Sequence, residues 1–139
     1  MSVTINPNGI LARQVAVVTG ASRGIGAAIA YRYAQEGAQV VVSARTLEDG
    51  DHTLEGGIND VAATINEAGG SALAIRADLN LEDDRVRLIE QTRSSLGEVD
   101  ILVNNGAVTY YAPVHEFSEK RYHLMMDVQV YAAFHLCQL

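Results

Sequence analysis

The stretch "TGASRGIG", residues 19–26, places three glycines within seven residues, between the apolar run "VAVV" and the helix-like run "AAIAYRYA". Such a turn either closes a strand-to-helix connection without a ligand or holds a phosphate. Gly20 permits a sharp turn after the strand, Gly24 lets the backbone come close to a ligand, and Gly26 lets the helix pack on the strand. The sequence therefore raises the hypothesis of a nucleotide cradle.

The setting of this glycine loop favours the phosphate interpretation. A buried strand precedes the loop and a helix follows it, which is the context in which such a pattern binds a dinucleotide. The helix N-terminus offers free N–H groups and a partial positive charge. Ser22 and Arg23 can add side-chain donors.

Apolar runs alternate between strand-like and helix-like periods along the whole chain. The residue ranges expected as buried strands are 14–19, 38–44, 71–78 and 100–105. The ranges expected as helices are 24–36, 58–68, 81–96 and about 119 onward. The apolar side of the first holds Ile25, Ala28, Ile29 and Tyr33, and one side of the third holds Val86, Ile89 and Leu96. Ser118 is expected as the N-cap of the last. Residues 46–59 form a long polar loop between them. This alternation predicts an α/β fold with a doubly wound, Rossmann-type parallel sheet in the order 3-2-1-4, within one domain spanning residues 1–139.

Composition limits the partners. The 139 residues carry a formal net charge of -7, which argues against a nucleic acid or an anionic membrane as the main partner. No apolar run is long enough to span a bilayer, and the N-terminus shows no signal peptide. The single Cys137 fits a reducing compartment, so we expect a cytoplasmic protein. The four histidines show no metal-ligand spacing, so we expect no metal site.

Three elements together resemble the short-chain dehydrogenase/reductase family. The loop "TGASRGIG" is similar to the family's TGxxxGxG loop, and "ADL", residues 77–79, resembles the acidic position that contacts the adenine. The run "LVNNGAV", residues 102–108, is similar to the family's NNAG element with its two small residues exchanged. The resemblance implies NAD(P)-dependent hydride transfer between an alcohol and a carbonyl substrate. The cofactor-binding residues that it implies are Gly20, Ser22, Arg23, Gly24, Ile25, Gly26, Arg45, Asp78, Leu79, Asn104, Asn105, Gly106 and Ala107.

The end of the second expected strand decides between the two dinucleotides. NAD binders commonly place Asp or Glu there, to accept from the ribose 2′-hydroxyl. Here Ala44 is followed by Arg45, which can pair bidentately with a 2′-phosphate, and Arg23 could join it. The alternative is that Arg45 is only solvated. We expect NADP rather than NAD.

The family's catalytic residues are the weak part of the resemblance. It implies a Ser, a Tyr and a Lys, the last two spaced YxxxK, and an Asn on the helix after the fourth strand. The residues four positions after the six tyrosines are Gln35, Gly37, Val114, His115, Met126 and His135, so no YxxxK is present. Gln129 falls at the family's Asn position and is the only catalytic candidate.

These patterns predict the cofactor-binding part of a short-chain dehydrogenase, cut before its later strands and inactive alone. The last helical pattern reaches Leu139 without a stop signal. A non-catalytic NADP-binding or interaction module remains an alternative, as does, less favoured, another Rossmann enzyme such as a methyltransferase. An unpaired fourth strand would invite self-association, so we expect a homo-oligomer.

Overall fold

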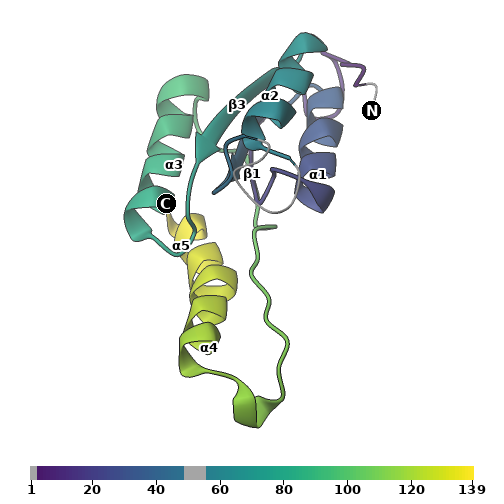
Figure 1. The fold of residues 1–139 in the computed structure, drawn as a ribbon. Helices are drawn as coiled ribbons and strands as arrows, with labels where there is room; N and C mark the ends of the chain where they lie inside the picture. The colour runs from purple at the N-terminus through teal and green to yellow at the C-terminus, as the bar shows by residue number, and fades with distance from the viewer. Residues whose placement is uncertain (1–2, 49–55) are drawn as a thin grey trace.

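The structure is a computed structural model of the 139-residue chain that describes residues 3–48 and 56–139 (Figure 1). The expected loop at residues 46–59 lies partly outside the described residues. The strands are β1 (Val15–Thr19), β2 (Gln39–Ala44), β3 (Ser71–Arg76) and β4 (Ile101–Val103). The helices are α1 (Gly24–Gln35), α2 (Ile58–Glu67), α3 (Glu82–Leu96), the 3-10 turn η1 (Val114–Glu116), α4 (Glu119–Met126), the π-helical segment η2 (Asp127–Tyr131) and α5 (Ala132–Gln138).

The four strands form one parallel sheet in the order β3-β2-β1-β4, which confirms the predicted topology. Strands β1 and β2 are almost wholly buried because helices cover both faces of the sheet. In this topology the carboxyl ends of all four strands meet at one edge, and the order reverses beside β1. The residues that follow the strands therefore converge there.

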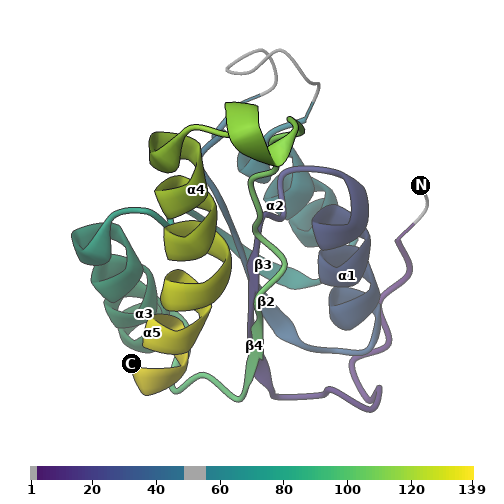
Figure 2. The ribbon, with the colours of Figure 1, turned by 90° about the horizontal axis from the view of Figure 1, so that it is seen from below.

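Two layers of helices enclose the sheet. Figure 2 shows α1 and α2 on one side and α3, α4 and α5 on the other. The first layer packs over Val18, Val40 and Val42, and the second over Val17 and Val41. Successive strand residues point to opposite faces, so the "VAVV" and "VVV" runs supply both cores at once.

Helix α1 buries a different side from the one expected. Its buried residues are Gly26, Ala27, Ala30 and Ala34. Ile25 is 75% exposed, so the expectation that it belongs to the apolar side is wrong. The small residues occupy the buried side because the helix lies against the backbone of the glycine turn. A Cβ on Gly26 would come 2.3 Å from the Gly20 carbonyl oxygen. Close approach here excludes large side chains.

Helix α3 also departs from the expected pattern. Leu88 and Ile89 are buried, but so are the polar residues Asp84, Arg85 and Thr92, whereas Val86 is only partly buried. The charged pair is tolerated because each member has hydrogen-bond partners, which the burial of a charge requires.

The expected last helix begins where predicted and is interrupted. The Ser118 side chain accepts a hydrogen bond from the Arg121 backbone N–H at 3.4 Å, which confirms the N-cap. The helix then passes through η2 before it continues as α5. A π-helical turn shifts the side chains after it around the helix axis, so the two halves present different faces. The segment after β4 and helix α4 extend away from the rest of the chain (Figure 1).

Candidate functional site

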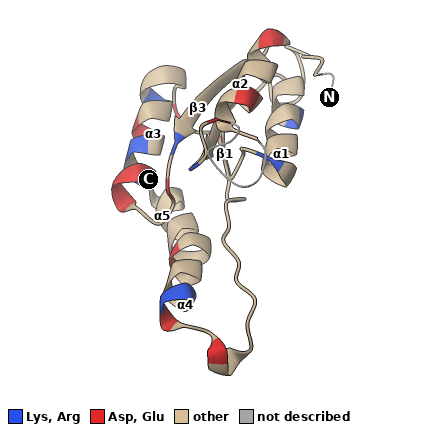
Figure 3. Cartoon of the chain, viewed as in Figure 1, with Lys and Arg blue, Asp and Glu red and all other residues tan. Residues whose placement is uncertain are grey.

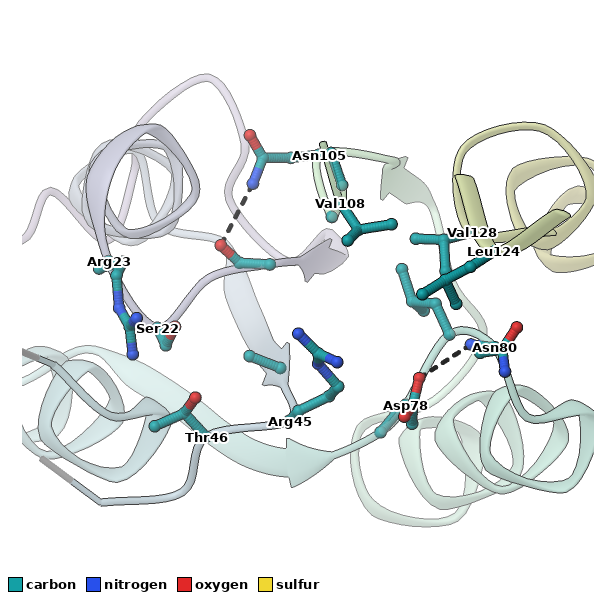
Figure 4. Close-up of a pocket in the computed structure, with 16 residues that line it drawn as sticks. Ser22, Arg23, Arg45, Thr46, Asp78, Asn80, Asn105, Val108, Leu124 and Val128 are labelled. Atoms are coloured by element: carbon teal, nitrogen blue, oxygen red, sulfur yellow. Dashed lines mark hydrogen bonds between the residues drawn. The ribbon is translucent and has the colours of Figure 1, made fainter. Parts of the chain in front are cut away.

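A pocket of about 560 Å³ opens at the carboxyl edge of the sheet (Figure 4). Its walls come from the segments after all four strands and from the last helix. The lining residues are Gly20, Ser22, Arg23, Ala44, Arg45, Thr46, Ala77, Asp78, Leu79, Asn80, Asn105, Gly106, Ala107, Val108, Leu124 and Val128. Nine residues that the sequence predicts for cofactor binding are among them. They are Gly20, Ser22, Arg23, Arg45, Asp78, Leu79, Asn105, Gly106 and Ala107.

The glycine loop has the geometry of a cradle. Gly20 has φ +65°, and a Cβ there would come 2.7 Å from the Gly106 Cα, so the turn is closed to other residues. Gly24 has φ +56° with nothing within 4 Å of its Cβ position, so its backbone lies open to a ligand. The N-cap of α1 is Arg23, and its side chain makes no capping bond. The first N–H groups of α1 can therefore donate to an anion.

Thr19, which the sequence analysis did not single out, fastens this loop to β4. Its hydroxyl donates to the Val103 carbonyl at 3.1 Å and accepts from the backbone N–H groups of Asn105, at 3.1 Å, and Gly106, at 2.9 Å. In the opposite direction, the side-chain amide of Asn105 donates to the carbonyls of Thr19, at 3.0 Å, and Gly20, at 3.2 Å. Asn105 thus stabilises the pocket floor. After β4 ends at Val103, the N–H groups of Asn105 and Gly106 turn to this hydroxyl and no longer extend the sheet.

Two arginines face the pocket from different segments. In Figure 4 the Arg45 side chain, which follows β2, points into the pocket. The Arg23 guanidinium donates to the Gly56 carbonyl at 2.9 Å, which ties the glycine loop to the segment before α2. Thr46, a buried residue that sequence reasoning missed, lies beside them. This corner combines cationic and hydroxyl donors in a chain of net charge -7.

Asp78 follows β3, the strand that pairs with β2, and lines the pocket near Arg45 (Figure 4). Its Oδ1 accepts from the Asn80 backbone N–H at 3.0 Å, and its own N–H donates to Asp84 Oδ2 at 2.7 Å. The expected strand 71–78 ends at Arg76 because the Asp78 N–H turns to this carboxylate and leaves the sheet. Burial raises the pKa of Asp84, but the Asp78 N–H bond and the Arg87 and Arg76 guanidinium groups outweigh it, so the pKa lies below its ordinary value.

Four predicted residues do not line the pocket. Gly24 and Ile25 lie at the exposed start of α1. The exposed Asn104 directs its amide to the Cys137 Sγ at 3.8 Å, away from the cradle. Gly26 is buried under the turn and acts through packing. Of the last helix, Leu124 and Val128 reach the pocket.

Gln129, the catalytic candidate, is exposed and lies in η2. It is not among the lining residues, so the structure does not bring it to the cofactor-binding set. No signal in the sequence marks the π-helical turn that surrounds it.

Other site types find no support within residues 3–48 and 56–139. No group of three or more His, Cys, Asp or Glu side chains is placed to hold a metal ion there. Among the helices of the same described part, none combines the length and apolar character that crossing a bilayer requires.

Comparisons with known proteins agree with this geometry. Residues 14–139 match the short chain dehydrogenase family. An uncharacterised oxidoreductase of Methylorubrum extorquens is 40% identical over 117 residues, which are 84% of this chain and 44% of that protein. A metagenomic short-chain oxidoreductase solved in complex with NADP is 35% identical with a TM-score of 0.81, over 91% of this chain and 54% of that one.

A blue fluorescent protein from a metagenomic library, solved in complex with NADPH, is 33% identical with a TM-score of 0.80, over 96% of this chain and 50% of that one. The chain therefore spans about half the length of these relatives.

Proposed function

The chain belongs to the short-chain dehydrogenase/reductase family, and on that premise we propose that it binds NADP(H) in the pocket at the carboxyl edge of its sheet. The observation that carries this proposal is Arg45, which follows β2 and points into the same pocket as the Gly20 turn (Figure 4). The glycine loop would hold the pyrophosphate, and Arg45 would hold the 2′-phosphate.

The chemistry of this corner favours a phosphate over a bare hydroxyl. A guanidinium can donate two parallel hydrogen bonds to phosphate oxygens, whereas a ribose hydroxyl offers a single weak acceptor. The position after Ala44 holds no carboxylate that would repel a 2′-phosphate. The relatives solved in complex with NADP and with NADPH support the same cofactor.

The reaction proposed for the protein as a whole is hydride transfer between an alcohol or carbonyl substrate and the nicotinamide, which supplies the redox chemistry when bound. The protein must then move one proton at the substrate oxygen. In the family a Tyr does this, with its pKa lowered by a nearby Lys. These 139 residues hold no YxxxK, and Gln129 stands exposed outside the pocket. For this chain we therefore propose nucleotide binding without turnover, which is also how a non-catalytic NADP-binding module would behave.

The test is a fluorescence titration of the 139-residue chain with NADPH and with NADH. Tighter binding of NADPH is expected, and Arg45→Ala should weaken NADPH binding about tenfold or more while leaving NADH nearly unchanged. Lys120→Ala, which removes the same charge from the exposed start of α4, serves as the matched control. Equal affinity for the two dinucleotides would contradict the role of Arg45.

Turnover is measured separately. Incubation with NADP⁺ and a panel of simple alcohols should leave absorbance at the nicotinamide band unchanged. Steady NADPH formation by the purified chain would refute the proposal that it binds without turnover.

A further inference from the structure

Asp84 is a buried carboxylate that lines no part of the pocket and still contacts a residue that does. It lies in the first turn of α3, which is formed by acidic residues (Figure 3). Its side chain is 11% exposed. One oxygen accepts from the Asp78 backbone N–H at 2.7 Å, and the other accepts from Arg87 at 2.7 Å. Both carboxylate oxygens are thus committed to named partners.

Nearly every polar atom of Asp78 makes a hydrogen bond. Its N–H donates to Asp84, its carbonyl accepts from the Leu81 N–H at 2.9 Å, and its Oδ1 accepts from the Asn80 N–H at 3.0 Å. Within the described residues, Oδ2 is the one polar atom of Asp78 without a hydrogen-bond partner. Figure 4 shows the carboxylate at the pocket wall. The turn therefore presents a single acceptor in a fixed direction.

The hydrogen bonds of Asp84 extend to the neighbouring segment after β2, which pairs with β3. Arg87, having bonded to Asp84, also donates to the Arg76 carbonyl at 2.9 Å. Arg76 in turn donates from Nε to the Arg45 carbonyl at 3.1 Å. One run of hydrogen bonds thus connects the backbone of Asp78 with the backbone of Arg45 in the neighbouring segment after β2.

The charge of Asp84 suits this role. The Asp78 N–H and the Arg87 and Arg76 guanidinium groups lower its pKa despite its burial, so the group is ionised near neutral pH. An ionised carboxylate accepts shorter and stronger hydrogen bonds than a neutral group. The N–H of Asp78 is therefore held tightly.

We propose that Asp84, steadied by Arg87, is a positioning residue for adenine recognition, acting through Asp78. That Asp78 contacts the adenine is what the family resemblance implies; the new element is that Asp84, through the Asp78 N–H, fixes the direction in which the free Oδ2 accepts from the 6-amino group. The inference rests on the proposed function, since it needs NADP(H) in this pocket. It assigns a base-reading role to a side chain that never touches the ligand.

The experiment compares NADPH with its hypoxanthine analogue, in which a carbonyl oxygen replaces the 6-amino donor. The wild-type chain should bind NADPH about tenfold more tightly, because one charge-assisted bond is lost in the analogue. Asp84→Ala should shrink this ratio of dissociation constants by about fivefold, because Asp78 then turns more freely. A purely structural role would weaken both ligands equally and leave the ratio unchanged.

Asp83→Ala is the matched control, because it removes the same charge from the same helical turn at an exposed position. Its ratio should equal that of the wild type. If Asp84→Ala fails to fold, Asp84→Asn, which keeps the side-chain shape, should still lower the ratio. A wild-type ratio in the Asp84 variants, or no preference in the wild type, overturns this inference and leaves NADPH binding intact. No binding of NADPH by the wild type overturns the proposed function, and this inference with it.

Discussion

The α1 side and the α4–α5 side of the sheet bury their residues in different ways (Figure 2). Beneath α1, glycine and alanine meet the backbone of the Gly20 turn with no room for a methyl group at Gly26. Along α4, η2 and α5, large apolar side chains stay exposed. They are Tyr122, Met126, Val130, Tyr131 and Phe134. The proposed nucleotide cradle is thus closely packed, whereas the helix beside it exposes large apolar side chains.

This contrast separates two requirements. A phosphate cradle needs a fixed backbone, which small residues and a hydroxyl provide through close contacts. A helix surface of large apolar residues provides area for packing and no fixed geometry for a ligand.

Gly26→Val should have the strongest effect on NADPH binding. The new Cβ would meet the Gly20 carbonyl oxygen at 2.3 Å and the Asn105 amide at 2.6 Å, so α1 must move. We expect a loss of about 1–3 kcal/mol of unfolding free energy, together with loss of NADPH binding. Urea denaturation and the fluorescence titration measure the two effects. Gly69→Ala, at φ +85° with nothing within 4 Å, is the control and should keep its affinity.

Thr19→Val should come next. The substitution keeps the shape and removes the hydroxyl that serves Val103, Asn105 and Gly106. The part-buried Gly106 N–H then loses its acceptor, whereas the Asn105 N–H keeps the Val103 carbonyl at 3.0 Å. A loss of about 1–3 kcal/mol is expected, with weaker NADPH binding. Thr92→Val is matched in burial, but its hydroxyl only repeats a helical contact to the Leu88 carbonyl. Equal losses in the two variants would show that the Thr19 bonds have no special weight.

Acid should weaken the fold through Asp84. Its folded pKa lies below the ordinary value of 3.8, so the unfolded chain takes up the proton first as the pH falls. The stabilisation is therefore fully present above about pH 5 and is lost as the pH falls below about 4. Urea denaturation at a series of pH values should show a shallower acid decline in Asp84→Asn than in the wild type. Parallel curves would exclude Asp84 as a source of this decline.

Phe134→Ser should have the smallest effect on folding. Phe134 is 59% exposed in α5, so its loss should change the unfolding free energy by no more than about 0.5 kcal/mol. Self-association through this exposed apolar surface, which would add to that expected at the unpaired edge of β4, should decrease; sedimentation velocity measures it. Leu136→Ala, on the same helix but 3% exposed, should cost about 2–4 kcal/mol. A large loss of unfolding free energy in Phe134→Ser would mean that this side chain contributes to the packing of the fold.

Local pattern was enough to predict the sheet order, the glycine loop and the Ser118 cap, because each depends on residues close in sequence or on the handedness of crossovers. Local pattern could not reveal the buried side of α1. The large apolar residues of that helix, such as Ile25, suggest the core side, but the close contact with the backbone of the Gly20 turn leaves room only for small residues there. Nor could local pattern reveal Thr19, whose partners lie in β4 and the segment after it. The interruption at η2 has no marker among residues 127–131.

The Thr19 hydroxyl also bears on the order of folding. Strand β1 is among the first structured residues in the chain, yet the turn that follows it is held by Val103, Asn105 and Gly106. Closing a loop of that length costs entropy that only the completed sheet can offset. The cradle therefore reaches its final geometry late, when β4 has joined the sheet. This holds although its glycines are synthesised early. The proposed affinity for NADP(H) would therefore be acquired in one step near the end of folding.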